Sequence, residues 1–216
     1  MTESLIDRIQ INTQSSIRIQ CPGSGLVLYS DPFKIPREAH DADVIFLTHD
    51  HYDHFDPDSI RKVVKDATIF VVPEKLQRQA ESYVPAGGSL ITVRPGMKLD
   101  AAGVSVETVP AYNLVKAFHP KRSGWVGYIL TIDGRRVYIA GDTDLTKENQ
   151  AVRCDIAFVP IGGTFTMDAK KAAELINIIR PETAIPIHYG SIVGSRSDAD
   201  VFRRNVDPWI EVVVKL

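Results

Sequence analysis

Three of the six histidines lie within six consecutive residues, His49-Asp50-His51-Tyr52-Asp53-His54. Neutral imidazole and carboxylate are ligands of zinc, manganese, iron, cobalt and nickel. Side chains two positions apart in an extended chain point to the same side, so His49 and His51 can reach one metal ion. As the chain turns, Asp53 and His54 can reach a second point nearby. This segment predicts a metal site, with a histidine-rich surface loop as the alternative.

Two later segments supply candidate partners for this histidine cluster. Asp142 follows Gly141 at the end of the apolar run Val137-Tyr138-Ile139-Ala140, and His188 follows the run Ile185-Pro186-Ile187. Alone, Asp142 would be interpreted as a turn residue and His188 as a structural histidine. Ligands of open α/β sheets gather at the carboxyl ends of strands, where both residues are predicted to lie. We therefore expect both to be metal ligands, which makes the surface-loop alternative less favourable.

Short apolar runs of strand length must position these side chains. The predicted strands cover residues 16–20, 26–29, 44–48, 68–72, 90–93, 104–109, 125–132, 136–140, 155–160, 184–187 and 211–214. Helices are predicted over 57–65, 73–82, 168–180 and 198–205, from capping Asp or Pro residues and from apolar residues at helical spacing. Asp133-Gly134 predicts a tight hairpin turn. Eleven strands exceed one comfortable open sheet, so two stacked sheets are expected in a single α/β domain over residues 1–216.

Composition restricts the class of protein further. The chain has 216 residues, 44% hydrophobic and 24% charged, with a formal net charge of -2. This balance lowers the expectation of a nucleic-acid partner. No apolar stretch is long enough to span a bilayer, and no signal peptide is expected, because charged residues interrupt the first twenty positions. Cys21 and Cys154 lack metal-site spacing, which favours a reducing, cytoplasmic location.

The motifs THDHYDH, GDTD and IPIHYG, in this order, resemble those of the metallo-β-lactamase superfamily. The longer segments PAYNLVKAFHP, GWVGYILTIDGRRVYIAGDTD and PIGGTFTMDAKKA resemble its small metal-dependent hydrolases. These are similar in turn to L-ascorbate-6-phosphate lactonase and N-acyl phosphatidylethanolamine phospholipase D. The resemblance covers nearly the whole chain. It implies a four-layer αββα sandwich with a dinuclear metal site at one edge.

The resemblance also implies a role for each candidate ligand. His49 and His51 would bind the first ion, Asp142 would bridge, and the second ion would be bound by Asp53, His54 and His188. Relatives take a third ligand for the first ion from Pro-Ala-x-His, but here the segment Pro110-Ala111-Tyr112-Asn113 ends in asparagine. His119, six residues on, is our preferred third ligand. The alternatives are the amide oxygen of Asn113 and a weak or empty first site.

Two divalent ions, which we expect to be zinc with manganese, iron, nickel or cobalt as alternatives, can lower the pKa of a shared water. Asp53 is the expected catalytic carboxylate that orients this water or takes its proton. Asp53, Asp142 and a hydroxide would leave the two-ion site at about +1, which favours an anionic ester, phosphoester or lactone. Asn113 and Lys116, with Lys121 and Arg122, are candidate substrate-binding residues, and an ordinary solvated loop is the alternative. Asp31 follows a predicted strand and either orients a ligand histidine or forms a plain turn.

The expected function is therefore a metal-dependent hydrolase of a small, anionic molecule. Two alternatives remain open: a metal-binding or sensor protein without turnover, and a mononuclear iron oxidoreductase on the same fold. Diiron relatives have glutamate at the position of His51, so His51 argues against the diiron branch. It leaves the mononuclear iron alternative open. No nucleic-acid or membrane partner is expected, and a homo-oligomer is left open.

Overall fold

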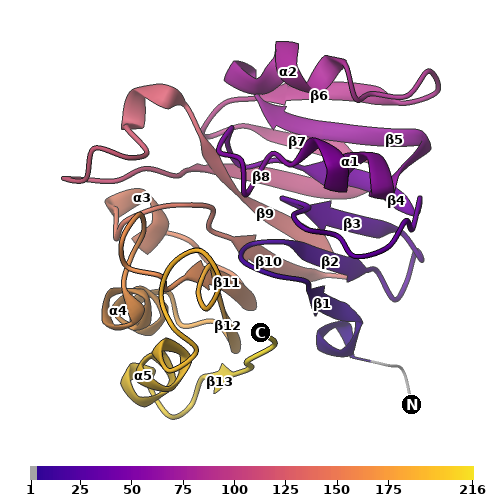
Figure 1. Ribbon diagram of the computed structural model, residues 1–216. Helices are drawn as coiled ribbons and strands as arrows, with labels where there is room; N and C mark the ends of the chain where they lie inside the picture. The colour runs from indigo at the N-terminus through magenta and orange to yellow at the C-terminus, as the bar shows by residue number, and fades with distance from the viewer. Residues whose placement is uncertain (1–3) are drawn as a thin grey trace.

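Two mixed β-sheets packed face to face form the centre of the computed structural model, which describes residues 4–216 (Figure 1). The first sheet consists of β1 (Ile9–Ile11), β2 (Ile17–Gln20), β3 (Val27–Ser30), β4 (Ala42–Phe46), β5 (Val64–Pro73) and β6 (Ser89–Val93), in that order. The second sheet has the order β13-β12-β11-β10-β9-β8-β7. Its strands are β7 (Lys98–Ala101), β8 (Val104–Pro110), β9 (Val126–Ile132), β10 (Arg135–Ile139), β11 (Ile156–Pro160), β12 (Thr183–Ile187) and β13 (Glu211–Val212). Strands β3 to β6 and β10 to β13 run parallel within their sheets.

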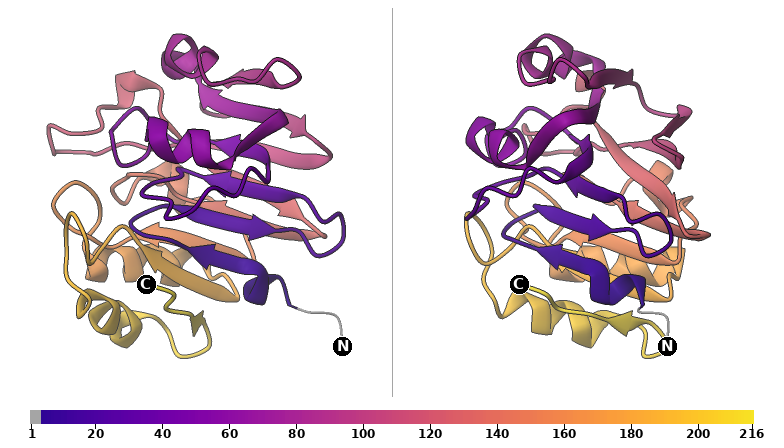
Figure 2. Two further views of the ribbon diagram at one scale, coloured as in Figure 1. Left: turned by 45° about the vertical axis from the view of Figure 1, so that its right-hand side comes forward. Right: turned by 90° about the vertical axis from the view of Figure 1, so that its right-hand side faces the viewer.

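Helices cover the outer face of each sheet and complete four layers (Figure 2). Helices α1 (Pro57–Val63) and α2 (Gln77–Glu81) pack on the first sheet, and α4 (Ala169–Ile179) and α5 (Asp198–Asn205) on the second. The short elements are α3 (Lys147–Gln150) and the 3₁₀ turns η1 (Leu5–Arg8), η2 (Glu74–Leu76) and η3 (Lys121–Ser123). The predicted αββα sandwich is thereby confirmed. Within residues 4–216, no helix is long and apolar enough to cross a membrane.

Strand β4 shows why the sequence before the histidine cluster is uninterruptedly apolar. Val44 and Phe46 face the core between the two sheets, whereas Ile45 and Leu47 face the core beneath α1 and α2. All four side chains are fully buried. A parallel strand covered on both faces needs apolar residues at every position. The run therefore ends where the chain leaves the core, immediately before the histidines.

The predicted elements form, but several boundaries were wrong. The helix predicted to reach Lys65 ends at Val63, because Val64 already pairs with Ala42 in the sheet. The helix predicted over 73–82 is divided into η2 and α2. Strands β1 and β7 and helix α3 were not predicted, since each has only three or four residues and little periodicity. The Asp133-Gly134 turn is confirmed: both residues have positive φ, 48° and 79°, and Ile132 pairs with Arg135 across the turn.

One buried hydroxyl links the two sheets just behind the histidine cluster. Tyr128 on β9 donates its hydroxyl to Leu47 O at 2.7 Å and lies 3.1 Å from Val71 O. Both acceptors belong to the first sheet, and the tyrosine ring packs against Phe46. Burial raises the pKa of Tyr128 well above its usual value, so the hydroxyl stays a donor. This contact fixes the end of β4 against the opposite sheet.

We expect Tyr128→Phe to lower the free energy of unfolding by about 1–2 kcal/mol, because a buried carbonyl loses its donor while the apolar packing is kept. Denaturant unfolding monitored by circular dichroism measures this change. The Tyr83→Phe variant, in which the ring lies half-buried near the surface, serves as the control. Equal stability of Tyr128→Phe and the unmodified chain would contradict the role given to this hydroxyl.

Candidate metal centre

Segments far apart in the sequence deliver seven ionisable side chains to one edge of the sandwich. The loop after β4 carries His49, His51, Asp53 and His54, and Asp142 and His188 follow the carboxyl ends of β10 and β12. His119 comes from the long loop between β8 and β9, at the left of Figure 1. Parallel strands whose carboxyl ends meet at one edge bring their following residues together. The structure therefore brings together all seven residues predicted as ligands.

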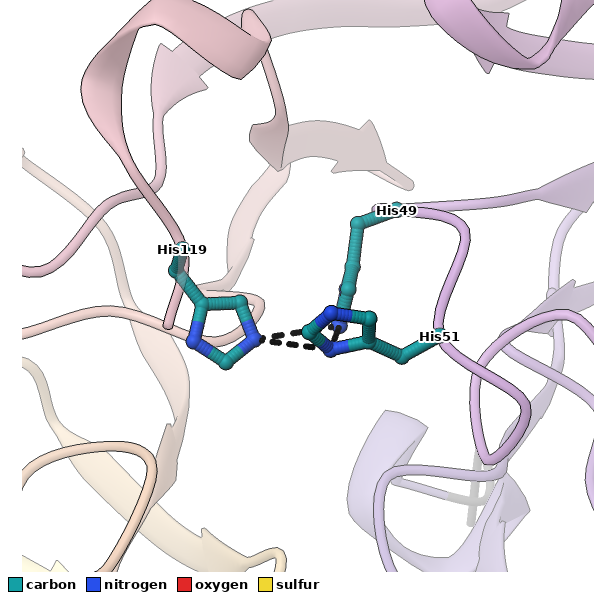
Figure 3. A group of neighbouring side chains, drawn as sticks. All are labelled: His49, His51 and His119. Atoms are coloured by element: carbon teal, nitrogen blue, oxygen red, sulfur yellow. Dashed lines mark hydrogen bonds between the residues drawn. The ribbon is translucent and has the colours of Figure 1, made fainter. Parts of the chain in front are cut away.

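Three histidine nitrogens converge on one point (Figure 3). His49 Nε2 lies 3.1 Å from His51 Nδ1 and 3.3 Å from His119 Nε2, and the latter two atoms are 3.1 Å apart. Nitrogens bonded to one tetrahedral ion at 2.0–2.1 Å are separated by ~3.3–3.4 Å. The triangle therefore has nearly the size that such an ion requires. His119, and not Asn113, completes this group.

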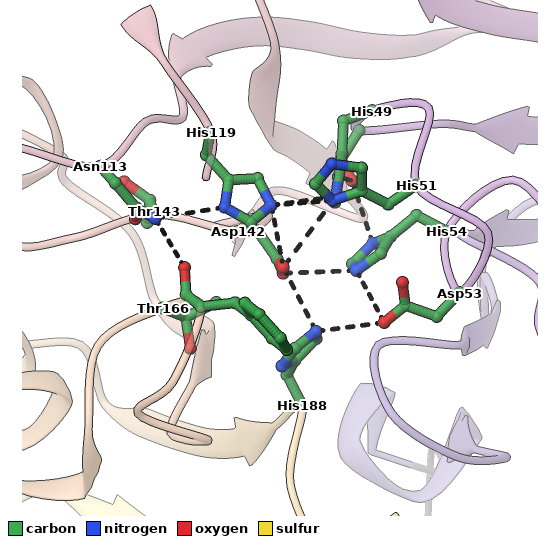
Figure 4. A network of polar contacts seen from close by, with 12 residues as sticks. His49, His51, Asp53, His54, Asn113, His119, Asp142, Thr143, Thr166 and His188 are labelled. Atoms are coloured by element: carbon green, nitrogen blue, oxygen red, sulfur yellow. Dashed lines mark hydrogen bonds and ion pairs between the residues drawn. The ribbon is translucent and has the colours of Figure 1, made fainter. Parts of the chain in front are cut away.

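A second group lies beside the first, and Asp142 touches both (Figure 4). His188 Nε2 lies 3.3 Å from Asp53 Oδ2, which is 3.6 Å from His54 Nε2. Asp142 Oδ1 lies 3.3 Å from His54 Nε2, and Asp142 Oδ2 lies 3.2 Å from His188 Nε2. The same Oδ2 is 3.3 Å from His119 Nε2 and 3.9 Å from His49 Nε2. The Asp142 carboxylate thus occupies the position between the two groups.

The unpaired polar atoms of these side chains fit bound cations. His54 Nε2, His188 Nε2 and Asp142 Oδ1 are buried and accept or donate no hydrogen bond of good geometry, although charged contacts of 3.2–3.3 Å join these side chains. Buried polar atoms almost always have a partner, and an orphaned one calls for an explanation such as an ion. The three atoms all face the interior of the seven-residue cluster. The residues present therefore fit one or more divalent cations.

The charges of the cluster are arranged as a cation site requires. Burial lowers the pKa of His49 well below its usual value, and burial likewise lowers that of His51. Both imidazoles are therefore neutral at pH 7, as ligands must be. Burial opposes charge on His188, but Asp142 and Asp53 raise its pKa to about 9. Burial also opposes charge on His54, whereas Asp142 and Asp31 raise its pKa. Without a metal ion, protonated His188 and His54 therefore supply the positive charge that balances the buried carboxylates.

Asp31 and Thr48 hold two of the histidines in the tautomer that metal binding needs. Asp31 follows β3, is fully buried, and accepts hydrogen bonds from Thr48 N, Thr48 Oγ1 and His54 Nδ1 at 2.7–2.8 Å. Because Thr48 donates to Asp31, its hydroxyl oxygen can accept from His49 Nδ1 at 3.0 Å. Protonation at Nδ1 leaves Nε2 of each histidine free as a ligand. Of the two roles considered for Asp31, a contact that can orient a candidate ligand histidine, His54, is the one that the structure favours.

Comparison with known proteins gives the family of the chain. Residues 7–189 match the family model of the beta-lactamase superfamily domain. The chain belongs to the beta-lactamase superfamily. It is 33% identical over 189 residues to a UPF0173 metal-dependent hydrolase of Thermoplasma acidophilum, covering 80% of each chain. A similar relative from Pyrococcus abyssi is 30% identical over 185 residues, covering 83% of this chain and 80% of the relative.

A solved structure of a candidate metal-dependent hydrolase from Parabacteroides distasonis superposes with a TM-score of 0.79 at 29% identity. The superposition covers 96% of this chain and 92% of the other. A metallo hydrolase of Ignicoccus hospitalis, 23% identical with a TM-score of 0.76, shares the fold over 95% of this chain and 93% of its own. The predicted superfamily and enzyme class, a metal-dependent hydrolase, are thereby confirmed.

Asn113, where many relatives of this superfamily are expected to have histidine, lies behind His119. Its backbone N–H donates to His119 O at 2.8 Å and closes a seven-residue loop, within which His119 has a positive φ of 56°. Its amide Nδ2 donates to Phe165 O at 2.7 Å and lies 3.2 Å from His119 Nδ1. Asn113 Oδ1 is buried without a partner. Because Phe165 O can only accept, the amide nitrogen is the atom that faces both this carbonyl and the His119 ring, and the side chain packs against that ring from behind.

We expect Asn113→Ala to weaken metal binding about tenfold, because a ligand histidine loses the group that orients it. Competition with a chromophoric chelator gives the affinity of each variant. Leu114→Ala, the next position and an exposed one, is the matched control and should bind as the unmodified chain does. An unchanged affinity in Asn113→Ala would contradict the orienting role.

Trp125 packs against all three rings of the first histidine group. Its ring centroid lies 5.1 Å from those of His49 and His51 and 5.5 Å from that of His119. On another side, Lys75 Nζ lies 4.6 Å from the indole centroid and 3.4 Å from Asp50 Oδ2. An indole packed against three imidazoles restricts their rotamers. Its role was not predicted, because a tryptophan at the start of a strand is usually only a core residue.

The predicted role of Lys116 in substrate binding is not supported by its position. Lys116 Nζ lies 2.5 Å from Asp144 Oδ1 and 2.6 Å from Thr166 O, so it ties its loop to the neighbouring ones. The cavity above the cluster, of ≈ 400 Å³, does not include Lys116 or Asn113 in its lining. Its floor is formed by His51, Asp53, His119, Asp142 and His188. Asn113 therefore acts on His119 from behind, and the cavity opens directly onto the candidate ligands.

Proposed function

We propose that this metal-dependent hydrolase holds two divalent cations and cleaves a small-molecule ester, phosphoester or lactone. The observation that carries the proposal is the division of the ligand atoms into two groups that share one carboxylate. His49, His51 and His119 form one group and Asp53, His54 and His188 another, and Asp142 forms a third with His49 and His54 between them. Asp142 contacts nitrogens of both groups. His54 Nε2 and His188 Nε2 are buried without a hydrogen bond, and a second cation would satisfy both atoms.

The side chains would divide the work as follows. The bound cations would supply Lewis acidity, which lowers the pKa of water and polarises the substrate oxygen. Asp53 lines the cavity and lies at the edge of the second group, where it can orient the attacking water or accept its proton. His188 and His54 lower the pKa of Asp53 although burial opposes this, so its carboxylate is ionised and available at neutral pH. Asp31 and Thr48 keep the histidine ligands in place during turnover.

The donor set suits zinc, and manganese, iron, nickel and cobalt accept the same nitrogen and oxygen ligands. With two cations, two carboxylates and a hydroxide, the reacting centre would have a charge of about +1. Such a centre favours a reacting group that is anionic or becomes anionic, such as a phosphoester or the oxyanion of ester cleavage. The free thiols of Cys21 and Cys154 support a reducing, cytoplasmic location.

Metal analysis combined with a hydrolysis panel tests the proposal. Purified protein loaded with zinc should bind two ions per chain. It should hydrolyse at least one class among bis(p-nitrophenyl) phosphate, aryl esters and lactones, and lose this activity with a chelator. One ion per chain would favour the mononuclear alternative. Two ions without turnover on any substrate would favour the non-catalytic metal-binding alternative.

We expect Asp53→Asn to lower kcat by about 10²–10⁴-fold, the usual contribution of a positioned general base. Asp58→Asn is the control, because Asp58 lies five residues further on, outside the cavity lining, and its exposed carboxylate pairs with Arg61 on α1. Steady-state kinetics of both variants at equal zinc content gives the comparison. The assignment of Asp53 fails if both variants retain the full rate.

A further inference from the structure

The walls of the cavity above the ligand cluster differ in chemistry from its floor. The walls are formed by the apolar side chains of Tyr52, Phe118, Phe165 and Ile192, and Asp50 completes the lining. Phe118 and Phe165 meet edge to face, with ring centroids 4.7 Å apart, and Tyr52 is held in the same way by Phe33 at 6.1 Å. Three loops, after β4, β8 and β11, thus each contribute an aromatic ring. The rings are positioned by their own contacts.

No lysine or arginine is among the described residues that line this cavity. Two cations of the neighbouring loop are engaged elsewhere: Lys116 contacts Asp144, and Lys121 lies 2.6 Å from Glu148 Oε1. Arg122, in the same loop, lies outside the lining. Asp50, the remaining charged residue of the lining outside the floor, is an anion paired with Lys75. A second anionic group on a substrate would therefore meet no counter-charge away from the floor, and would approach a carboxylate.

Two of the aromatic side chains in the cavity walls are also exposed to solvent. Phe118 is 48% exposed and Tyr52 66% exposed, and both belong to the small set of large hydrophobic side chains exposed in residues 4–216. Apolar surface that gathers around a concave polar floor is typical of a ligand site. A ligand that covers these rings removes apolar area from water and is stabilised accordingly.

From this juxtaposition of an aromatic wall with a floor of candidate metal ligands we infer the substrate class. The substrate has one reacting ester, lactone or phosphoester group at the floor, and an uncharged apolar chain or ring against Tyr52, Phe118 and Phe165. This inference rests on the proposed function for the reacting group. It adds that the substituent carries no second charge, and that the two phenylalanines determine specificity.

A series of hydroxamates tests the substituent without relying on turnover. The hydroxamate group binds zinc in every member of the series. A longer chain therefore changes only the apolar contact with the cavity walls. Titration calorimetry on zinc-loaded protein should show the affinity rising about two- to fourfold per methylene from acetohydroxamate to hexanohydroxamate. Succinic monohydroxamate has a terminal carboxylate. It should bind at least about tenfold more weakly than the uncharged hydroxamate of the same length. An affinity that is independent of length, or that favours the carboxylate, overturns the inference.

Variants locate the effect on the wall. In Phe118→Ala and Phe165→Ala, the hydroxamate affinity should hardly rise with each added methylene. Phe118→Leu should restore part of this rise. Val115→Ala is the matched control, because Val115 is 92% exposed in the same loop and outside the lining. Zinc content, measured for each variant, shows that the floor is retained. A full increment in both alanine variants would contradict the assignment of the wall.

Hydrolysis of aryl esters with the same acyl chains separates this inference from the proposed function. Turnover that does not depend on chain length supports the hydrolase and overturns the apolar substituent. Length-dependent hydroxamate binding without turnover of any ester, lactone or phosphoester supports the apolar wall and overturns the proposed reaction. A rate that rises with chain length in the unmodified chain, and not in Phe118→Ala, supports both.

Discussion

Replacing Asp142 with alanine is expected to lower kcat/KM by at least ~10³-fold, equivalent to about 4 kcal/mol of transition-state stabilisation. Bound zinc should fall from two ions per chain to one or fewer. The reason is the central position of this carboxylate, which lies 3.2–3.9 Å from nitrogens of His49, His54, His119 and His188. Burial raises its pKa, but the surrounding histidines lower it well below the usual value, so it is an anion at neutral pH.

Asp142→Asn separates the charge of this side chain from its shape. The amide keeps one oxygen at nearly the same place but removes the negative charge that two cations share. We expect metal affinity to fall in both variants, and more strongly in Asp142→Ala. Zinc stoichiometry by elemental analysis and kinetics at saturating zinc give the two readouts. Retention of two tightly bound ions in Asp142→Ala would show that the carboxylate does not bridge.

Removal of the metal is expected to lower the melting temperature by roughly 8–16 °C. A ligand present at a thousand times its Kd stabilises the folded state by about 4 kcal/mol. For a chain of this size each kcal/mol corresponds to about 2–4 °C. The metal-free cluster must also keep His54, His188 and Asp142 buried with ligand atoms that form no hydrogen bond. Calorimetry with and without a chelator measures the difference.

The Asp142→Ala variant supplies the control for this measurement. Its melting temperature should respond much less to chelator, because it binds less metal from the start. Equal melting temperatures of the unmodified chain with zinc and with chelator would contradict a structural contribution of the metal. A chelator effect of the same size in Asp142→Ala would place the stabilising ion elsewhere.

Sequence analysis predicted the features that depend on local pattern. The apolar run ending at Thr48 fixes a buried strand, and the strand ends at Asp142 and His188 follow from similar runs, so their convergence could be inferred from strand direction. The tight turn at Asp133-Gly134 was also predictable, because few residue pairs adopt two positive φ angles. Periodicity and turn chemistry carry this information within a few residues.

Features that depend on the path of a loop could not be predicted in the same way. His119 reaches the site because Asn113 closes the loop onto it, and a sequence gives no distance between their side chains. The same holds for Lys116, whose charge suggested a binding role before its partner Asp144 was known. The apolar wall was missed because Phe118 and Phe165 lie on different loops and have no common spacing. Tertiary contacts, and not residue types, decide such roles.

The position of Trp125 against the histidines gives the protein an internal optical reporter. The chain has two tryptophans, and the other, Trp209, is 65% exposed and packs in neither ligand group. A soluble quencher such as acrylamide should suppress the emission of Trp209 and leave that of the buried Trp125. Loading with cobalt, whose absorption bands accept energy from an indole at this range, should then dim the remaining emission as the first group fills. Occupancy of that group could be followed in real time, without a label, in every variant that retains Trp125.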